Sequence, residues 1–251
     1  MLAGKTTLPD RTCVRIQLFN FAGQEISALL RGELEVIVAW LGRWQARRFA
    51  LHLVVIILGA GLYGATMGWW RDPQQALYVS IKFPLIILLT TLGNALINGM
   101  LAPLLGLNIP FRQSFSAILM SFTIAAAILG AFSPVMAFMI WNAPPMSPQA
   151  ISGATYSLIK LANVAVIAFA GTAGNVRLFQ TLTRLGGSNA IAFRVLVAWL
   201  AANLFLGSQL SWILRPFIGS PNLPVEFFRA TALHGNFYEN VFQTLQQIFN
   251  D

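Results

Sequence analysis

Residues 49–70 read FALHLVVIILGAGLYGATMGWW and contain no acid, lysine or arginine. A helix needs about 20 mostly apolar residues to cross about 30 Å of hydrocarbon, and this stretch is long enough. It ends in Trp69 and Trp70, and tryptophan is typical of the interface between membrane and water. The stretch therefore predicts a transmembrane helix.

Four more apolar runs of sufficient length follow this stretch. They cover about 76–98, 114–141, 151–173 and 190–214. The second run continues past Asn98 and is too long for one untilted span, so residues 100–109 are either part of it or a separate surface or re-entrant piece. Pro134 predicts a kink in the third run. We expect an all-α polytopic bundle of five transmembrane helices at 49–214, with amphipathic terminal helices in the segments 1–48 and 215–251.

The composition excludes most catalytic chemistry. The chain is 57% hydrophobic and 10% charged, against about a quarter charged in soluble domains. No acid lies between Pro73 and Val225, so that region cannot hold paired catalytic carboxylates or a carboxylate proton relay. One cysteine, Cys13, and two histidines, His52 and His234, cannot supply three or four ligands to a metal. We expect a protein that is not an enzyme and has no metal site, while a bound lipid or pigment stays open.

The distribution of lysine and arginine predicts the orientation. Ten of them fall on the side of the N-terminal segment, and three, Arg71, Arg215 and Arg229, fall on the opposite side. Cytoplasmic loops carry the excess of positive charge, so we expect the N-terminus in the cytoplasm and the C-terminus outside. Because the cations lie between apolar spans, and not in a groove with exposed aromatic rings, nucleic acid is not an expected partner.

Both termini show helical periodicity. An apolar stripe recurs at steps of three and four residues through Ile26, Leu30, Leu34, Ile37, Leu41 and Trp44, and it predicts one continuous helix. This helix either lies in the cytoplasmic interface of the bilayer or packs on the protein itself. At the other end, Asn236 and Glu239 form a capping pair that predicts a helix over 237–249, after the loop PFIGSPNLP at 216–224.

Three cations fall inside the predicted spans. Lys82 and Arg194 lie near span ends, where long side chains reach the headgroups. Lys160 is placed near the middle of the membrane with no acid in any span to pair with it. We therefore define a candidate polar cavity from the cation and the nearby span amides, namely Lys160, Asn163, Asn94, Asn98 and Asn203. These amides either join the helices by hydrogen bonds or line a path for a small neutral or anionic solute.

Small residues predict close helix packing at two places. Ala60, Gly64 and Gly68 repeat every fourth residue in the first span, and Ala170 and Gly174 do so in the fourth. Such ladders let helix backbones approach closely, either within one chain or between copies in a homo-oligomer.

Two segments carry a resemblance to known proteins. The sequences IKFPLIILLTTLGNALINGMLAPLLGLN at 81–108 and GSQLSWILRPFIGSP at 207–221 resemble those of a group of bacterial multi-pass membrane proteins with no assigned activity. Some of these proteins are labelled as actin-binding WH2 proteins, but this chain has no LKKT-like element. The five-span layout is also similar to Yip1-type proteins of membrane trafficking, although the DLYGP-like motif is absent. The resemblance implies a location in the bacterial inner membrane and transfers no catalytic residue.

Two functions remain after these exclusions. The first is a non-enzymatic membrane assembly, scaffold or membrane-organising subunit, whose partners are the lipid bilayer, further copies of the chain or another protein of a membrane complex. The alternative is a small channel or transporter for an anion or polar solute.

Overall fold

The computed structural model describes residues 11–147, 154–220, 222–240, 242 and 246, and it describes side chains from residue 21 onward. The described chain is helical and contains no strand. Its helices are α1 (Arg11–Arg31), α2 (Leu34–Leu41), α3 (Ala46–Trp69), α4 (Pro73–Leu104), α5 (Phe111–Trp141), α7 (Ala154–Gly186) and α8 (Asn189–Ile213).

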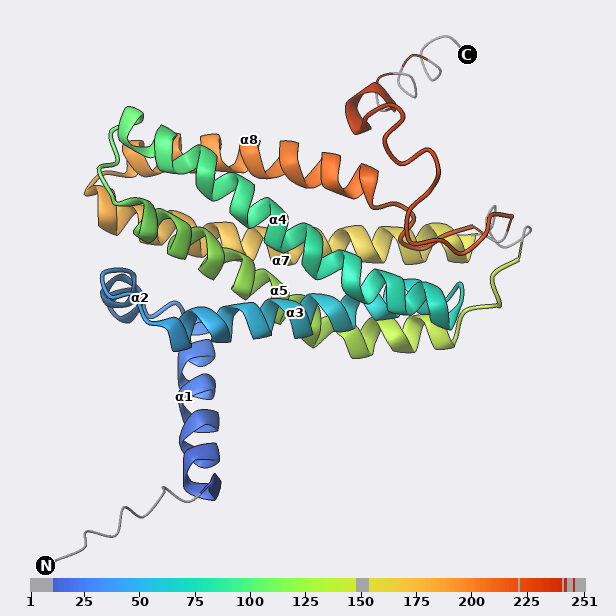
Figure 1. Ribbon diagram of the computed structural model, residues 1–251, viewed down its shortest axis with the longest axis horizontal. Coiled ribbons are helices and arrows are strands. Elements are labelled where there is room, and N and C mark those ends of the chain that lie inside the picture. Colours follow the sequence, from blue (N-terminus) through green and yellow to red (C-terminus); the bar gives the residue numbers. More distant parts are fainter. Residues whose placement is uncertain (1–10, 148–153, 221, 241, 243–245, 247–251) are drawn as a thin grey trace, which may run out of the picture.

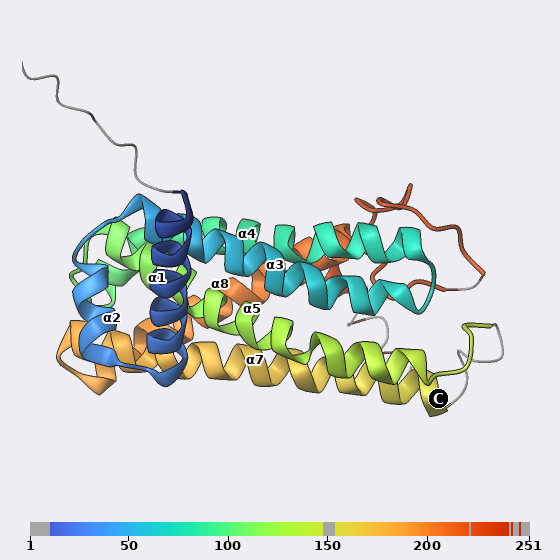
Figure 2. The same cartoon turned by 90° about the horizontal axis from the view of Figure 1, so that it is seen from below.

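Five of these helices, α3, α4, α5, α7 and α8, are long and apolar enough to cross a membrane. The predicted all-α bundle with five spans is thereby confirmed, and the chain is a multi-pass membrane protein by the length and composition of its helices. The five helices lie side by side along the long axis of the molecule, whereas α1 extends almost at right angles to them (Figures 1 and 2).

The bundle has two distinct ends (Figure 1). One carries α1, α2 and the α4–α5 and α7–α8 connections, and we call it the N-terminal end. The other carries the α3–α4 turn and the residues after α8, and we call it the C-terminal end. The residues that connect α8 to the last described helical turn, 214–220 and 222–236, are called the C-terminal loop.

Residues 100–104 belong to α4 and do not begin a separate surface or re-entrant piece. The helix continues through Pro103 to Leu104, so no separate piece begins at residue 100. Gly106 then adopts a left-handed φ of 92°, and the Leu107 N–H donates to the Ala102 carbonyl at 2.9 Å. This arrangement is a Schellman cap, which closes a helix with glycine in the left-handed region. Helix α5 likewise runs without interruption through Pro134.

The prediction of one continuous helix over residues 26–44 is wrong. Gly32 has a φ of 74° and ends α1 with the same kind of cap, in which the Glu33 N–H donates to the Ala28 carbonyl at 3.1 Å. Helix α2 starts afresh at Leu34, and the chain turns again before α3. The apolar stripe is thus divided between two helices, and Leu29 and Ile37 join the same buried cluster.

The small-residue ladders pack helices of one chain against each other. A Cβ atom added to Gly64 of α3 would lie 2.6 Å from the Val79 carbonyl oxygen of α4. A Cβ atom added to Gly174 of α7 would lie 2.6 Å from the Ser121 carbonyl oxygen of α5. Helix backbones approach this closely only where a side chain is absent. Both ladders are therefore used within the chain.

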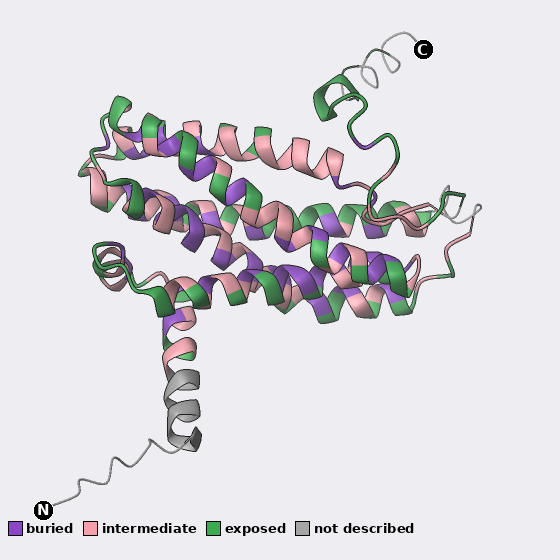
Figure 3. Cartoon of the chain, in the orientation of Figure 1, coloured by how far each residue is buried: buried purple, intermediate pink, exposed green. Residues whose placement is uncertain are grey.

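Helix α8 is embedded in the bundle along only part of its length. Its buried residues, Ala192, Val195 and Trp199, all lie in its first half. In its second half Leu204 and Phe205 are exposed. Figure 3 shows the same division, with buried residues of α8 confined to the N-terminal end of the bundle. The second half of α8 therefore presents an apolar face away from the rest of the chain.

Candidate functional site

Three of the predicted cavity residues form a hydrogen-bonded ladder between α4 and α8. The Asn94 side-chain amide donates to the side-chain oxygen of Asn203, and the Asn98 amide donates to the side-chain oxygen of Asn94. Asn94 and Asn98 lie one helical turn apart on α4, so both reach the same side of the helix. Both have 0% of their surface exposed to water. No water-sized space therefore adjoins either amide.

Asn163 lies in a different part of the bundle. Its side-chain oxygen accepts a hydrogen bond of 3.0 Å from the Tyr63 hydroxyl of α3, and its amide donates to the Ile159 carbonyl at 2.9 Å. Tyr63 and Asn163 are both buried. Among the described residues no hydrogen bond connects this pair to the α4–α8 ladder. The pair joins α3 to α7, two helices that the sequence does not mark as neighbours.

The structure does not bring Lys160 together with the asparagines. Its side chain is exposed on α7, with the ammonium 5.5 Å from the centre of the Tyr156 ring. That ring lies 5.7 Å from the ring of Trp70, the residue that follows α3 at the C-terminal end. Lys160 therefore lies six residues after the start of α7 at Ala154, near the C-terminal end of the bundle. Because helical side chains point toward the helix N-terminus, its ammonium is directed back toward that end.

Lys82 is a cation that the described chain buries, and the C-terminal loop covers its side chain. Its ammonium donates to the carbonyls of Pro216 at 3.1 Å and Glu226 at 3.5 Å. It also lies 5.0 Å from the centre of the Phe227 ring. These partners belong to the C-terminal loop, which folds back over α4. The sequence gives no sign of this, because the partners lie well over a hundred positions away. By contrast, Arg194 is exposed as expected.

Two other basic residues also fasten the C-terminal loop. Arg215 lies 3.7 Å from the Trp212 ring and donates to the carbonyls of Trp212 at 2.6 Å and Thr231 at 3.2 Å. Burial and the nearby charge of Arg229 lower the pKa of Arg215. Arg71, at the α3–α4 turn, donates to the Leu223 carbonyl at 3.2 Å. The loop is thus held by cations that bond to backbone carbonyls.

At the N-terminal end, a buried ion pair docks α1 against the start of α3. The Arg48 Nε lies 2.9 and 2.8 Å from the two carboxylate oxygens of Glu25, and the side chains are 11% and 5% exposed. The guanidinium also lies 4.6 Å from the centre of the Trp40 ring. Sequence reasoning missed this pair, because the two residues are 23 positions apart and meet only after the chain reverses at Gly32.

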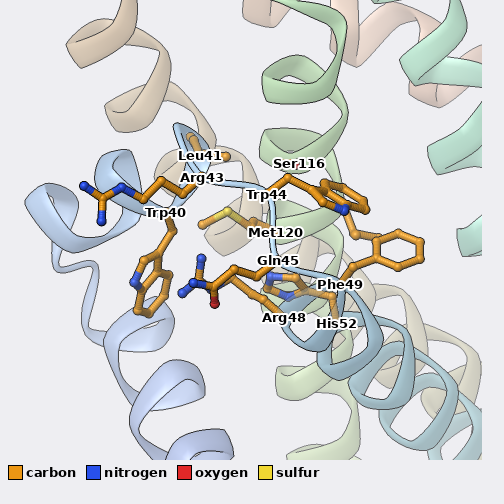
Figure 4. A pocket seen from close by; sticks show the side chains of 11 residues that line it. Trp40, Leu41, Arg43, Trp44, Gln45, Arg48, Phe49, His52, Ser116 and Met120 are labelled. Atoms are coloured by element: carbon orange, nitrogen blue, oxygen red, sulfur yellow. The ribbon is translucent and has the colours of Figure 1, made fainter.

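A small cavity of about 20 Å³ adjoins this ion pair. Side chains from α2, the connection before α3, α3 itself and α5 surround it, among them Trp40, Trp44, Arg48 and His52 (Figure 4). The Nδ1 atom of His52 is buried and has no hydrogen-bond partner in the described part of the chain. The volume is enough for about one water molecule, and the site offers polar atoms to bind it.

Two larger hollows lie on the surface of the molecule. A groove of about 400 Å³ between α3 and α5, at the C-terminal end, is lined by Ala65, Thr66, Trp69, Ala137, Ile140 and Trp141. A second hollow of about 620 Å³ lies between α1 and α2 and includes the charged residues Glu25, Arg31 and Glu33. None of the five predicted cavity residues lines either hollow.

The capping pair at the C-terminus is confirmed. The Glu239 N–H donates to the Asn236 side-chain oxygen at 2.8 Å, and the helical turn begins at Phe237. Tyr238 stacks on Phe205 at 5.7 Å between ring centres and bonds to Ser208 at 2.9 Å, so this turn lies on the exposed half of α8. The predicted end of the helix at residue 249 lies outside the described residues.

No group of three histidine, cysteine or acidic side chains that could together hold a metal ion occurs within residues 21–147, 154–220 and 222–240. No protein-family model, curated protein or solved structure matches the chain.

Proposed function

We propose that this protein is a non-enzymatic membrane assembly or scaffold subunit. The observation that carries the proposal is the packing of the buried amides. A residue that lines a water-filled path keeps surface that water can reach, but Asn94 and Asn98 have none. The hydrogen bond from Asn94 to Asn203 joins α4 to α8, and the bond between Tyr63 and Asn163 joins α3 to α7. These two bonds thus act between helices of the bundle.

The exposed surfaces support a role in binding other membrane components. The second half of α8 carries Leu204 and Phe205 on its outer face, with the Tyr238 turn stacked beside them. At the opposite end, α1 extends away from the spans and the hollow beside α2 exposes charged residues. A membrane protein whose buried polar groups bond to each other, and whose two ends keep separate exposed surfaces, is suited to bind a partner at each end.

We also propose how the protein is oriented in the membrane. Ten lysines and arginines lie on the side of the N-terminal segment and three on the opposite side, which supports a cytoplasmic N-terminus in a bacterial inner membrane. Helix α1 then runs along the cytoplasmic membrane surface, because it lies at right angles to the spans (Figure 1). The C-terminal loop and its cations then lie on the outer side.

Reconstitution separates this proposal from the channel alternative. We expect vesicles that contain the protein to remain tight to chloride, phosphate and small polar solutes. Asn94→Leu should leave the vesicles tight and destabilise the bundle by about 0.6 to 1.7 kcal/mol, because one interhelical hydrogen bond in a membrane contributes about 0.6 kcal/mol on average and about 1.7 kcal/mol at most. Asn175→Leu is the matched control, because the Asn175 amide bonds to Gly171 of its own helix and to no other described residue. Solute flux that Asn94→Leu abolishes and Asn175→Leu preserves would overturn the proposal.

Photo-crosslinking in intact cells tests the assembly role directly. A photoreactive residue at Phe205 reports on the exposed half of α8, and the same residue at Leu58 reports on an exposed position of α3. We expect a discrete cross-linked protein product at Phe205 and only lipid adducts at Leu58. If both positions give only lipid adducts, the second half of α8 is not a protein-binding face.

A further inference from the structure

Three basic side chains converge at the C-terminal end of the bundle, where α4 meets the C-terminal loop. Lys82 bonds to the carbonyl of Pro216, the residue directly after Arg215. Arg215 bonds to the carbonyl of Thr231, two positions after Arg229. Lys82 also bonds to the carbonyl of Glu226 at 3.5 Å, three positions before Arg229. The loop thus gathers three positive charges that are far apart in the sequence.

The acids at this end of the bundle do not neutralise the cluster. Asp72 accepts a hydrogen bond of 2.7 Å from the Gln74 N–H and caps α4. Glu239 belongs to the capping pair with Asn236. Glu226 offers its backbone carbonyl to Lys82, and its carboxylate forms no ion pair within the described part of the chain. Among the described residues, no acid therefore forms an ion pair with these three cations.

Arg229 is the member of the cluster with free hydrogen-bond donors. Lys82 and Arg215 already donate to backbone carbonyls. The Arg229 side chain is partly exposed and forms no hydrogen bond or ion pair with any described residue, although its backbone carbonyl accepts a bond of 2.9 Å from the Ala232 N–H. A guanidinium presents five N–H donors in a planar fork, which matches two oxygens of a phosphate group. The cluster thus combines buried positive charge with an accessible phosphate-binding group.

We propose that Lys82, Arg215 and Arg229 form a binding site for a phosphate-type anion at the C-terminal end of the bundle. The site lies where the spans end, at the level of lipid headgroups, and the loop beside it exposes the apolar side chains of Leu223 and Phe228. This position favours the phosphodiester of an anionic phospholipid, because its phosphate oxygens match the guanidinium fork and its net negative charge is attracted to the three cations. Lys82 and Arg215 supply charge from within the protein, and Arg229 contacts the anion directly.

The test uses the full-length protein in a neutral detergent. Binding is measured for short-chain phosphatidylglycerol, short-chain phosphatidylcholine and inorganic phosphate. We expect phosphatidylglycerol to bind, phosphatidylcholine to bind at least ten-fold more weakly, and Arg229→Gln to weaken phosphatidylglycerol binding by about ten-fold or more. Arg229→Lys keeps the positive charge and should recover part of the affinity. Arg112→Gln removes an exposed arginine at the N-terminal end and should leave binding unchanged.

The outcomes distinguish the sources of the anion. Binding of phosphatidylglycerol without competition by inorganic phosphate identifies a lipid headgroup. Competition by inorganic phosphate, with both ligands weakened by Arg229→Gln, identifies a site for free phosphate-type anions. Equal affinity for both lipids, or the same loss in Arg229→Gln and Arg112→Gln, overturns the proposal. Thermal unfolding of each variant checks that the bundle is intact, and Arg229 is suited to this test because its side chain forms no hydrogen bond or ion pair in the described part of the chain.

Discussion

The substitution Glu25→Gln should release α1 from the bundle while the spans remain folded. Glu25 accepts both of its short contacts from the Arg48 Nε, and both side chains are almost fully buried. Glutamine keeps the size of the side chain and removes its charge. Arg48 is then left as a buried cation that has lost its counterion.

The expected cost follows from the surroundings of Arg48. Removing one partner of a buried ion pair costs about 3 to 5 kcal/mol, because the remaining charge is no longer compensated. Here the guanidinium keeps its position over the Trp40 ring, which offsets about 0.5 to 1 kcal/mol or more. We therefore expect a loss of about 2 to 4.5 kcal/mol. This loss corresponds to about a 30- to 1,500-fold shift from docked to undocked α1.

Hydrogen exchange in detergent micelles measures this shift. Amides of residues 21–31 should exchange faster in Glu25→Gln, while those of residues 117–124 in α5 should be unaffected. Glu35→Gln is the matched control, since Glu35 faces Arg184 at 3.5 Å in a pair that is largely exposed. Exposed pairs contribute about 0 to 1 kcal/mol, so this control should change little.

A double substitution tests the reason for the effect. Glu25→Met combined with Arg48→Met removes both charges and should restore part of the protection that Glu25→Gln loses, because no unpaired charge remains. Unchanged exchange of residues 21–31 in Glu25→Gln would refute the reasoning. Equal effects of Glu25→Gln and Glu35→Gln would refute it as well, because burial would then play no part.

Three further substitutions test the packing of the spans. Gly64→Leu should destabilise the α3–α4 contact by about 1 to 3 kcal/mol or prevent insertion, whereas Gly171→Leu, with no atom within 4 Å of an added Cβ, should be tolerated in thermal unfolding. Tyr63→Phe removes the hydroxyl that bonds to Asn163 and should lower the stability of the bundle by about 0.6 to 1.7 kcal/mol. An unchanged midpoint of thermal unfolding would show that this bond does not stabilise the bundle. Lys160→Met should leave both stability and vesicle tightness unchanged, since the side chain is exposed on α7, and a large loss of stability would place it in the interior.

The local sequence determined the membrane-spanning helices and their number. Apolar runs of sufficient length predict spans because the bilayer requires each helix to satisfy its own backbone hydrogen bonds. The capping pair at Asn236 was predictable for a similar reason, since a cap depends on residues three positions apart. The break at Gly32 also had a local signal, a glycine within the apolar stripe, but the periodicity of that stripe concealed it.

The position of each side chain around its helix was decided by tertiary structure. Lys82 and Lys160 both lie inside apolar helices, but one is buried beneath the C-terminal loop and the other is exposed. A span in a membrane is apolar on all sides, so hydrophobic periodicity does not identify the face that packs inward. That face depends on which helices become neighbours.

The candidate sites also depend on which helices pack beside each other. Asn94 and Asn98 were predictable as a pair because they share one face of α4, but their partner Asn203 required α8 to pack beside α4. The ion pair of Glu25 with Arg48 and the bonds from Lys82 to the C-terminal loop join segments that local patterns treat separately. The sequence by itself determined which segments enter the membrane, because hydrophobicity and backbone hydrogen bonding are local. Only the tertiary structure decided which charges meet, because electrostatic pairing acts between segments that folding brings together.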